Sequence, residues 1–300
     1  MIGRIHKIAA NDCEVHVEGG VLRCRFRGKL KREWKVALKL AAVGDLVEVT
    51  PGAAGEGTIE KVLPCRSKFS RHDVLRPSRE QVIVANVDLL FIVQAAQDPD
   101  FNDLIVDKCT VMGAANGLPC VIVVNKSDLA RPDLSVYEKT GYRCVRTSAK
   151  TGEGVSEICG FLKDRTTVFL GPSGVGKSSL INLLAPGADV NVGEVSRHGE
   201  GRHTTSWVEL LSAGGGLVAD TPGMEFFTLW NVTSENLKDH FLDFVELAAG
   251  CRFRDCLHTD EEVCAVRGHV AGSRYRNYRA ILERFRSGRS RKRGPMGRSI

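Results

Sequence analysis

One short segment limits the fold of this chain more than any other feature of the sequence. It fits the pattern G-x-x-x-x-G-K-[ST], follows the apolar run Thr167–Leu170 and opens the helical stretch Lys177–Leu184. A strand, a glycine-rich turn and a helix in this order are the context of a phosphate-binding loop, in which backbone N–H groups surround phosphates. Lys177 is expected to reach the β- and γ-phosphates, and Ser178 to bind Mg²⁺. The residues expected to hold the nucleotide here are Gly171, Pro172, Ser173, Gly174, Val175, Gly176, Lys177, Ser178 and Ser179.

Apolar and helical stretches alternate on both sides of this loop. Strand candidates lie at 89–93, 121–124, 166–170 and 216–219. Helical stretches, for example Asn102–Ala115, separate most of them. Strands that are apolar throughout are typical of a mostly parallel sheet covered on both faces, so the sequence predicts an α/β domain. Three glycines at 214–216 stand between two apolar runs and predict a hairpin.

Two short motifs bear on the choice of nucleotide base. Asn125, Lys126, Ser127 and Asp128 resemble the N-K-x-D element of GTPases, and Ser148, Ala149 and Lys150 resemble the S-A-K element. Each follows an expected strand, and open α/β sheets bind ligands at the carboxyl ends of their strands. The carboxylate of Asp128 can accept hydrogen bonds from the ring N–H and the amino group of guanine, a pair that adenine cannot offer. The sequence therefore predicts that these residues bind GTP or GDP.

A further element follows the expected strand at 217–219. Asp220-Thr221-Pro222-Gly223 resembles the D-x-x-G switch element, in which Asp220 assists Mg²⁺ and the N–H of Gly223 meets the γ-phosphate. Thr204 and Thr205, between the phosphate loop and this strand, are placed like the threonine that coordinates Mg²⁺. The sequence leaves open which of the two does so.

The order of these motifs is unusual. Ordinary GTPases run from the phosphate loop through the switches to N-K-x-D and S-A-K. Here the base-recognition motifs begin at 125 and 148, and the phosphate loop follows at 171. Such a circular permutation is physically allowed because the motifs meet at one edge of the sheet and are joined by surface loops.

The first 65 residues have a different pattern. Leu22, Cys24 and Phe26 alternate with three arginines, which puts apolar side chains on one strand face and positive charge on the other. Several short strands within this length favour a small barrel such as an OB-fold. The polar, basic stretch Pro64–Arg79 is expected to be a linker or flexible loop.

The chain after Trp230 predicts a helical, metal-binding region. A helix is expected to begin near Thr233 or Ser234, and another carries a stripe from Tyr275 to Phe285. The first helix is expected to bury Leu237, Phe241, Phe244 and Val245. Three thiols and one imidazole within fourteen residues are a closed tetrahedral set for one structural Zn²⁺. The expected ligands are Cys251, Cys256, His258 and Cys264.

Charge is unevenly distributed over the 300 residues. The net charge is +6, but segment 274–300 holds ten Lys/Arg against one acid, and basic residues also exceed acidic ones in 1–72. Basic ends around an acidic centre indicate contact with a polyanion. The terminal stretch 287–300 is expected to be disordered unless bound. No apolar run is long enough for a membrane helix, no export signal is indicated, and the scattered cysteines indicate a reducing compartment.

Taken together, the motifs resemble those of the circularly permuted, ribosome-small-subunit-dependent GTPases, a bacterial assembly-factor family. The resemblance spans nearly the whole chain and rests on the permuted order, the segment 85–88, the segment 201–205 and the C-x4-C-x-H-x5-C spacing. It implies a cytoplasmic, monomeric enzyme that hydrolyses GTP, binds the 30S subunit and its 16S rRNA in late maturation, and is stimulated by the subunit. The expected domains are an OB-fold at 1–70, a permuted GTPase domain at 71–229 and a zinc-binding helical domain at 230–300.

One catalytic group remains to be assigned. Many GTPases place a Gln directly after D-x-x-G to orient the attacking water, but this chain has Met224, which offers no hydrogen-bond donor. His203, beside the two threonines, is the candidate for this role, and the resemblance points to the same residue.

Two other classes of protein remain as alternatives. A P-loop kinase or ATPase would use the same phosphate loop, but Asp128 and the motif at 148–150 argue against it. A non-catalytic RNA-binding scaffold would not need Lys177, Ser178 and Asp220. Competition between GTP and ATP for binding distinguishes a GTPase from a kinase or ATPase. A measured turnover of GTP distinguishes it from a non-catalytic scaffold.

Overall fold

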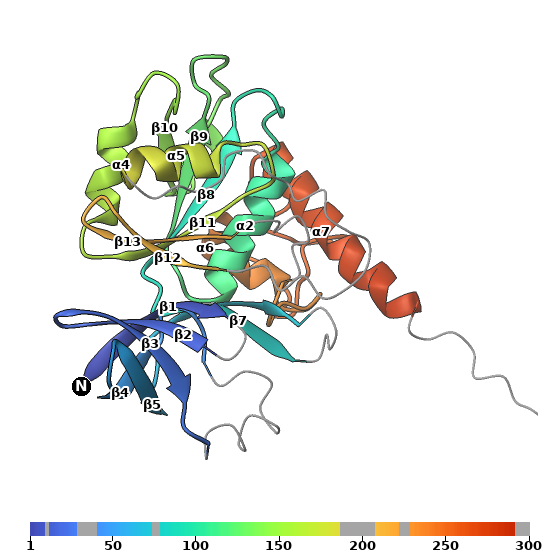
Figure 1. The fold of residues 1–300 in the computed structure, drawn as a ribbon. Helices are drawn as coiled ribbons and strands as arrows, with labels where there is room; N and C mark the ends of the chain where they lie inside the picture. The colour runs from blue at the N-terminus through green and yellow to red at the C-terminus, as the bar shows by residue number, and fades with distance from the viewer. Residues whose placement is uncertain (10–11, 29–40, 74–78, 187–207, 222–228, 292–300) are drawn as a thin grey trace, which may run out of the picture.

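The computed structural model describes residues 1–9, 12–28, 41–73, 79–186, 208–221 and 229–291. Figure 1 shows a small barrel, a central sheet with helices on both faces, and a helical C-terminal region beside it. Buried apolar side chains form one cluster inside the barrel and one on each face of the central sheet.

The N-terminal strands close into a barrel, as the sequence predicts. The strands are β1 (Ile2–Ala9), β2 (Asp12–Val17), β3 (Gly20–Phe26), β4 (Leu46–Pro51) and β5 (Glu56–Val62), in the order β1-β2-β3-β5-β4. The period of two in β3 places Cys24 and Phe26 inside the barrel and leaves Arg23 and Arg25 outside.

The expectation of a linker or loop over Pro64–Arg79 is wrong for part of this stretch. Strand β6 (Lys68–His72) lies within it and pairs antiparallel with β7 (Glu80–Ala85). Phe69 is fully buried, and Lys68 forms an ion pair with Glu80 at 2.7 Å. The strand is stabilised by pairing with residues 80–85, and its own polar sequence does not reveal this contact.

The central sheet is mostly parallel, in agreement with the sequence. Its six strands, in spatial order, are β10 (Arg143–Arg146), β9 (Cys120–Asn125), β8 (Leu89–Ala95), β11 (Thr166–Leu170), β13 (Gly216–Asp220) and β12 (Leu210–Ala213). Only β12 and β13 pair antiparallel among these strands, and they form the predicted hairpin. The helices that pack on the sheet are α2 (Asp103–Ala115), α3 (Ser135–Lys139), α4 (Val155–Leu162) and α5 (Lys177–Leu184).

The barrel contacts the edge of this sheet through β1. Lys7 forms an isolated bridge with Glu209, and their side chains form an ion pair at 2.7 Å. One residue away, Nδ1 of His6 lies 3.0 Å from the carbonyl oxygen of Leu210. The N-terminal barrel is therefore fixed against the strand that leads into the hairpin.

The C-terminal helices differ from the expected single helix near 233. A 3₁₀ turn, η1 (Leu237–His240), is followed by the short helix α6 (Leu242–Ala248), and Val245 is exposed rather than buried. The change of direction at Phe241 still buries that ring, together with Phe244, against α7 (Gly272–Arg291). Helix α7 has the predicted apolar stripe, with Tyr278, Ile281 and Leu282 buried.

Helix α7 also continues further than expected. It runs through residues 287–291, which the sequence assigns to a disordered tail, whereas 292–300 lie outside the described residues. In Figure 1 the helix lies beside α2 and extends away from the sheet. Among the helices of the described residues, none has the length and apolar character required to cross a membrane.

Candidate nucleotide-binding site and metal centre

The phosphate loop adopts the conformation that its glycines allow. Gly174 and Gly176 have φ angles of +78° and +90°, a backbone conformation that residues other than glycine rarely adopt. A Cβ atom at Gly171 would lie 2.1 Å from the carbonyl oxygen of Val93, so only glycine fits where the loop leaves the sheet. The ammonium group of the buried Lys177 donates to the carbonyl oxygens of Gly171, at 2.9 Å, and Pro172, at 2.8 Å. Lys177 is thus held at the loop that is predicted to surround the nucleotide phosphates.

Asn125 joins the three motif loops. Its side-chain amide donates to the carbonyl oxygen of Val175 in the phosphate loop at 2.9 Å. Its oxygen accepts from the backbone N–H of Ala149 at 3.1 Å and lies 3.4 Å from the hydroxyl of Thr147. The approach is close enough that a Cβ atom at Gly176 would lie 2.3 Å from Nδ2 of Asn125. Motifs that are permuted in sequence therefore meet at one place.

Asp128 is oriented by the neighbouring motif. The hydroxyl of Ser148 donates to its Oδ1 at 2.6 Å, and this bond holds the pKa of the carboxyl group below its ordinary value. A hydrogen bond to the charged form favours ionisation, so Asp128 is a carboxylate at neutral pH. A carboxylate has about four lone-pair sites, so Asp128 keeps acceptor capacity for the two donors of guanine. Lys126 contacts the carbonyl oxygen of Asp98, and the side chain of Lys150 is exposed.

The residues at the end of β13 fit a magnesium ion. The hydroxyl of Ser178 donates to Oδ2 of Asp220 at 3.3 Å, while Oδ1 of Asp220 is buried and has no hydrogen-bond partner. Burial raises the pKa of this carboxyl group, although Lys177 and Ser178 oppose the shift. A buried, unsatisfied carboxylate oxygen beside a hydroxyl is a donor set that Mg²⁺ accepts. Cation binding would also remove the cost of burying that oxygen.

Several predicted site residues lie outside the described residues. They are His203, Thr204, Thr205 and Gly223, together with Met224. Of the phosphate loop, Ser173 and Gly174 are exposed, whereas Val175 is buried. Ser178 and Ser179 follow at the start of α5 with partly buried side chains.

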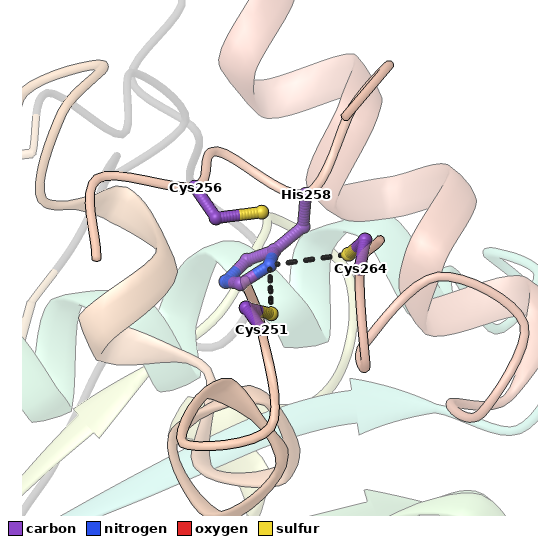
Figure 2. Close-up of side chains that lie close together, drawn as sticks. All are labelled: Cys251, Cys256, His258 and Cys264. Carbon is purple, nitrogen blue, oxygen red and sulfur yellow. Dashed lines mark hydrogen bonds between the residues drawn. The ribbon is translucent and has the colours of Figure 1, made fainter. Parts of the chain in front are cut away.

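The four predicted zinc ligands converge in space. Their ligand atoms all lie within 4.8 Å of one another, and Figure 2 shows the four side chains pointing toward a common centre. Nδ1 of His258 lies 3.6 Å from Sγ of Cys251 and 3.4 Å from Sγ of Cys264. A tetrahedral zinc ion with ordinary bond lengths places nitrogen and sulfur ligands about 3.5 Å apart.

The surroundings of these ligands also suit a metal thiolate. The backbone N–H of Ala265 donates to Sγ of Cys251, and that of Arg267 to Sγ of Cys264, both at 3.3 Å. Burial lowers the pKa of His258, which keeps the imidazole neutral and its lone pair available. The donor set and its geometry therefore fit Zn²⁺.

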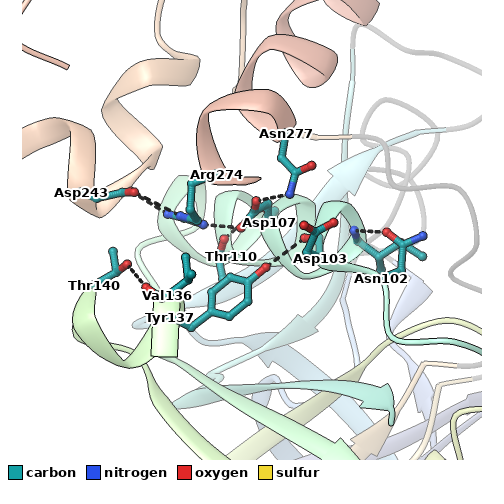
Figure 3. Close-up of polar contacts among 11 residues, drawn as sticks. Asn102, Asp103, Asp107, Thr110, Val136, Tyr137, Thr140, Asp243, Arg274 and Asn277 are labelled. Carbon is teal, nitrogen blue, oxygen red and sulfur yellow. Dashed lines mark hydrogen bonds and ion pairs between the residues drawn. The ribbon is translucent and has the colours of Figure 1, made fainter. Parts of the chain in front are cut away.

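A buried polar cluster between α2, α6 and α7 could not be predicted from the sequence. Arg274 of α7 donates to Asp107 of α2 and, at 2.7 Å, to Asp243 of α6, and Asn277 donates to Asp107 at 2.7 Å (Figure 3). Arg274 and Asp107 are 1% and 0% exposed. An arginine in a basic helix looks like a surface residue, and only the packing of α7 on α2 shows otherwise.

Comparison with known proteins identifies the family. The model of the RsgA GTPase matches residues 62–230, and that of the RsgA N-terminal domain matches residues 2–59. The chain belongs to the RsgA GTPase family. It is accordingly a GTPase, an enzyme that hydrolyses GTP to GDP with Mg²⁺ as the usual metal ion.

Relatives named RsgA match most of this chain. The small ribosomal subunit biogenesis GTPase RsgA of Caldanaerobacter subterraneus subsp. tengcongensis is 38% identical over 97% of both chains. RsgA of Chlorobaculum tepidum is 40% identical over 81% of this chain and 85% of its own. The crystal structure of YjeQ from Thermotoga maritima superposes with a TM-score of 0.73 at 33% identity and covers 95% of this chain and 98% of its own.

A second solved structure bears on the order of the motifs. It is described as YloQ, a circularly permuted GTPase, and has a TM-score of 0.73, 29% identity, and coverage of 99% of this chain and 96% of its own. The permutation expected from the sequence is therefore confirmed.

Proposed function

We propose that this GTPase acts in late maturation of the small ribosomal subunit, where it binds the 30S subunit through its 16S rRNA and is stimulated by it. The names of relatives that match nearly the whole chain support the proposal. The observation that carries the enzymatic part is the meeting of the two base-recognition motifs and the phosphate loop at Asn125. The site of such activity is the cytoplasm, where small subunits are assembled, and the working form is a monomer.

At the nucleotide, we propose a role for each motif residue. Asp128 binds the guanine edge, while Asn125, Lys126, Ser127 and the segment 148–150 support the base. The loop 171–179 surrounds the phosphates, and Lys177 moves from its carbonyl partners to the β- and γ-phosphates. Ser178 and Asp220 hold Mg²⁺, which supplies charge stabilisation at the phosphates when bound. His203, Gly223 and one of Thr204 and Thr205 complete the proposed site around the γ-phosphate.

We further propose three domains with boundaries at 1–70, 71–229 and 230–300, the last held together by one Zn²⁺ on Cys251, Cys256, His258 and Cys264. Two matched family segments, 2–59 and 62–230, support a division into an N-terminal domain and a GTPase domain that ends near residue 230. The ligand geometry described above supports the metal.

We propose that the barrel contacts RNA through a basic strip that consists of Arg23, Arg25, Arg27, Lys29, Lys31 and Arg32. The first three of these residues already have partners within the barrel. Arg23 and Arg25 donate to Asp12, and Arg27 forms an ion pair with Glu60 at 2.5 Å. These side chains are about two-thirds exposed, so phosphates can reach them, but the two acids reduce the net charge of the face. The remaining residues of the expected basic strip, Lys29, Lys31 and Arg32, lie outside the described residues.

Co-sedimentation tests the ribosomal part of the proposal. The protein, with a non-hydrolysable GTP analogue, is centrifuged with purified 30S subunits and, as a control, with 50S subunits at matched concentration. It should sediment with 30S subunits, and the bound fraction should fall as salt rises because phosphate contacts release counterions. Equal sedimentation with both subunits would contradict the proposal. A competition experiment distinguishes this protein from an ATPase, because excess ATP should not displace bound GDP.

A further inference from the structure

One carboxylate beside the base-recognition motifs has no assigned role. Glu153 lies two residues before the start of helix α4, and its side chain is 38% exposed. Its Oε2 accepts a hydrogen bond from the hydroxyl of Ser127 at 2.7 Å, and its Oε1 accepts from Arg131 at 2.9 Å. Ser127 is the variable residue of N-K-S-D and is buried. The acid thus bonds to the loop that carries Asp128 and to a residue three positions beyond it.

The backbone of the same residue bonds to the second motif. The carbonyl oxygen of Glu153 accepts from the N–H of Ser148 at 3.0 Å. The hydroxyl of Ser148 accepts from the N–H of Thr151 at 3.1 Å and donates to Asp128 at 2.6 Å. The hydroxyl of Thr151 in turn accepts from the N–H of Glu153 at 3.3 Å. A series of hydrogen bonds therefore runs from Asp128 through Ser148, Thr151 and Glu153 to Ser127. The peptide bond between Ser127 and Asp128 closes this series into a ring.

From this ring we infer that Glu153 is a positioning residue for guanine recognition. The inference rests on the proposed role of Asp128. Glu153 does not touch the base; it fixes the separation of the N-K-S-D and S-A-K loops, so that the carboxylate of Asp128 meets both guanine donors at once. Because bidentate recognition tolerates little displacement, loss of this bridge weakens the contact with the amino group of guanine.

Inosine diphosphate, which lacks that amino group, gives the specific readout. The dissociation constants of GDP and IDP are measured by isothermal titration calorimetry for wild type, E153A, E153Q, R131A and D128N. E153A should raise the dissociation constant of GDP about tenfold and that of IDP much less, so the preference for GDP shrinks. E153Q keeps an oxygen for Ser127 and should retain most of the preference. R131A removes only the exposed ion pair and should retain it as well.

Two further variants keep the test decisive. S127A removes the other end of the same hydrogen bond and should reproduce the effect of E153A, and the S127A/E153A double variant should be no worse than either single variant. S127A provides the answer if E153A does not fold. An unchanged GDP-to-IDP preference in E153A or S127A, with D128N impaired, would overturn the role of Glu153 alone. If D128N also binds GDP normally, the proposed guanine site itself is wrong.

Discussion

Asp128 and Ser148 show how a single hydrogen bond prepares a recognition group. The hydroxyl of Ser148 bonds to one oxygen of the carboxylate and lowers its pKa, so the acceptor is charged and oriented before the nucleotide arrives. A preoriented acceptor loses little conformational freedom on binding, and this favours the ligand whose donors match it.

Replacement of this carboxylate tests base selection. In Asp128→Asn, the amide keeps an oxygen for Ser148 but presents an N–H to the base, so GDP should bind at least about tenfold more weakly, since an unmatched buried polar group costs ~1–3 kcal/mol or more. A xanthine nucleotide, which has a carbonyl in place of the amino group, should gain affinity. Competition titrations with GDP and XDP measure both effects. Unchanged GDP affinity would remove Asp128 from the base site.

The sequence predicts residues of this site unequally. Motif residues such as Asn125 and Asp128 were predictable because their chemistry requires a fixed residue type at a fixed spacing. The role of Glu153 was not predictable, because a glutamate near a helix start is common. Its proposed role depends on a hydrogen bond with Ser127, 26 positions earlier in the chain. His203 stays a prediction, since it lies outside the described residues.

At the scale of elements, the short segment 251–264 depends on its ligands more than on a core. Cys256 and His258 are buried, yet this stretch contains no helix or strand. Its order must come from the convergence of ligands and from the contacts of Tyr275 and Tyr278, whose hydroxyls donate to the carbonyl oxygens of His258 and Leu257.

Metal analysis and substitution test this dependence. Freshly purified protein should contain one Zn²⁺ per chain, measured by mass spectrometry of the metal. Cys256→Ala should lose the metal and make segment 251–264 sensitive to protease, because structural zinc supplies folding free energy directly. Cys65→Ala, at an exposed thiol away from the cluster, is the matched control and should retain zinc. Protein free of zinc but protected from protease would contradict the metal centre.

The contact of α7 with α2 rests on a buried ion pair whose loss can be measured. Arg274→Ala leaves Asp107 buried without its cation, which should cost about 3–5 kcal/mol of the free energy of unfolding. Arg276→Ala, two residues along on the exposed face, should cost little. Urea unfolding of the two variants compares them directly. Similar stabilities would show that the pair contributes nothing beyond a surface charge.

The pH dependence of the Arg274 variant follows from the same pair. Burial raises the pKa of Asp107 from its ordinary value to about 6, although Arg274 and Asn277 oppose the shift. Because the pKa is higher in the folded state than in the unfolded state, the ionised carboxylate opposes folding above this pH, and protonation relieves the penalty as pH falls. Without Arg274 the pKa rises further. The loss of stability should therefore be smaller at about pH 5 than at about pH 8, and an equal loss at both would contradict this account.

Strands and helices were predictable to different degrees. The apolar runs of the central sheet give strands without reference to their neighbours, because burial on both faces demands continuous apolar sequence. Strand β6 was missed because its residues are polar and its stability depends on pairing with β7. The single helix expected from 233 divides at Phe241, where the chain turns so that two aromatic rings face α7.

At the scale of the whole molecule, the permuted order joins the base and phosphate loops by a short path. The chain passes from the S-A-K motif through α4 and β11 directly into the phosphate loop. The segment after D-x-x-G leads instead to the C-terminal helices. We propose that contact of the barrel and the C-terminal region with the ribosomal subunit controls hydrolysis at the nucleotide site.

His203 is the residue through which we expect this control to act. His203→Ala should remove most of the hydrolysis stimulated by 30S subunits and leave GDP affinity nearly unchanged, since a positioned orienting group contributes about 10²–10⁴-fold. His198→Ala, the same change five residues earlier, is the control and should remain stimulated. Single-turnover hydrolysis with saturating 30S subunits measures the effect. A decrease of less than about threefold, far below that range, would assign the role to another group.

Phosphate release from GTP, with and without purified 30S subunits, tests the central claim most directly. The account predicts slow release by the protein alone, clear acceleration by 30S subunits but not by 50S subunits, and no release from ATP. It also predicts loss of the acceleration at high salt, because the subunit is bound through phosphate contacts. Release from GTP that is equally fast with and without 30S subunits would contradict a GTPase controlled by the small subunit.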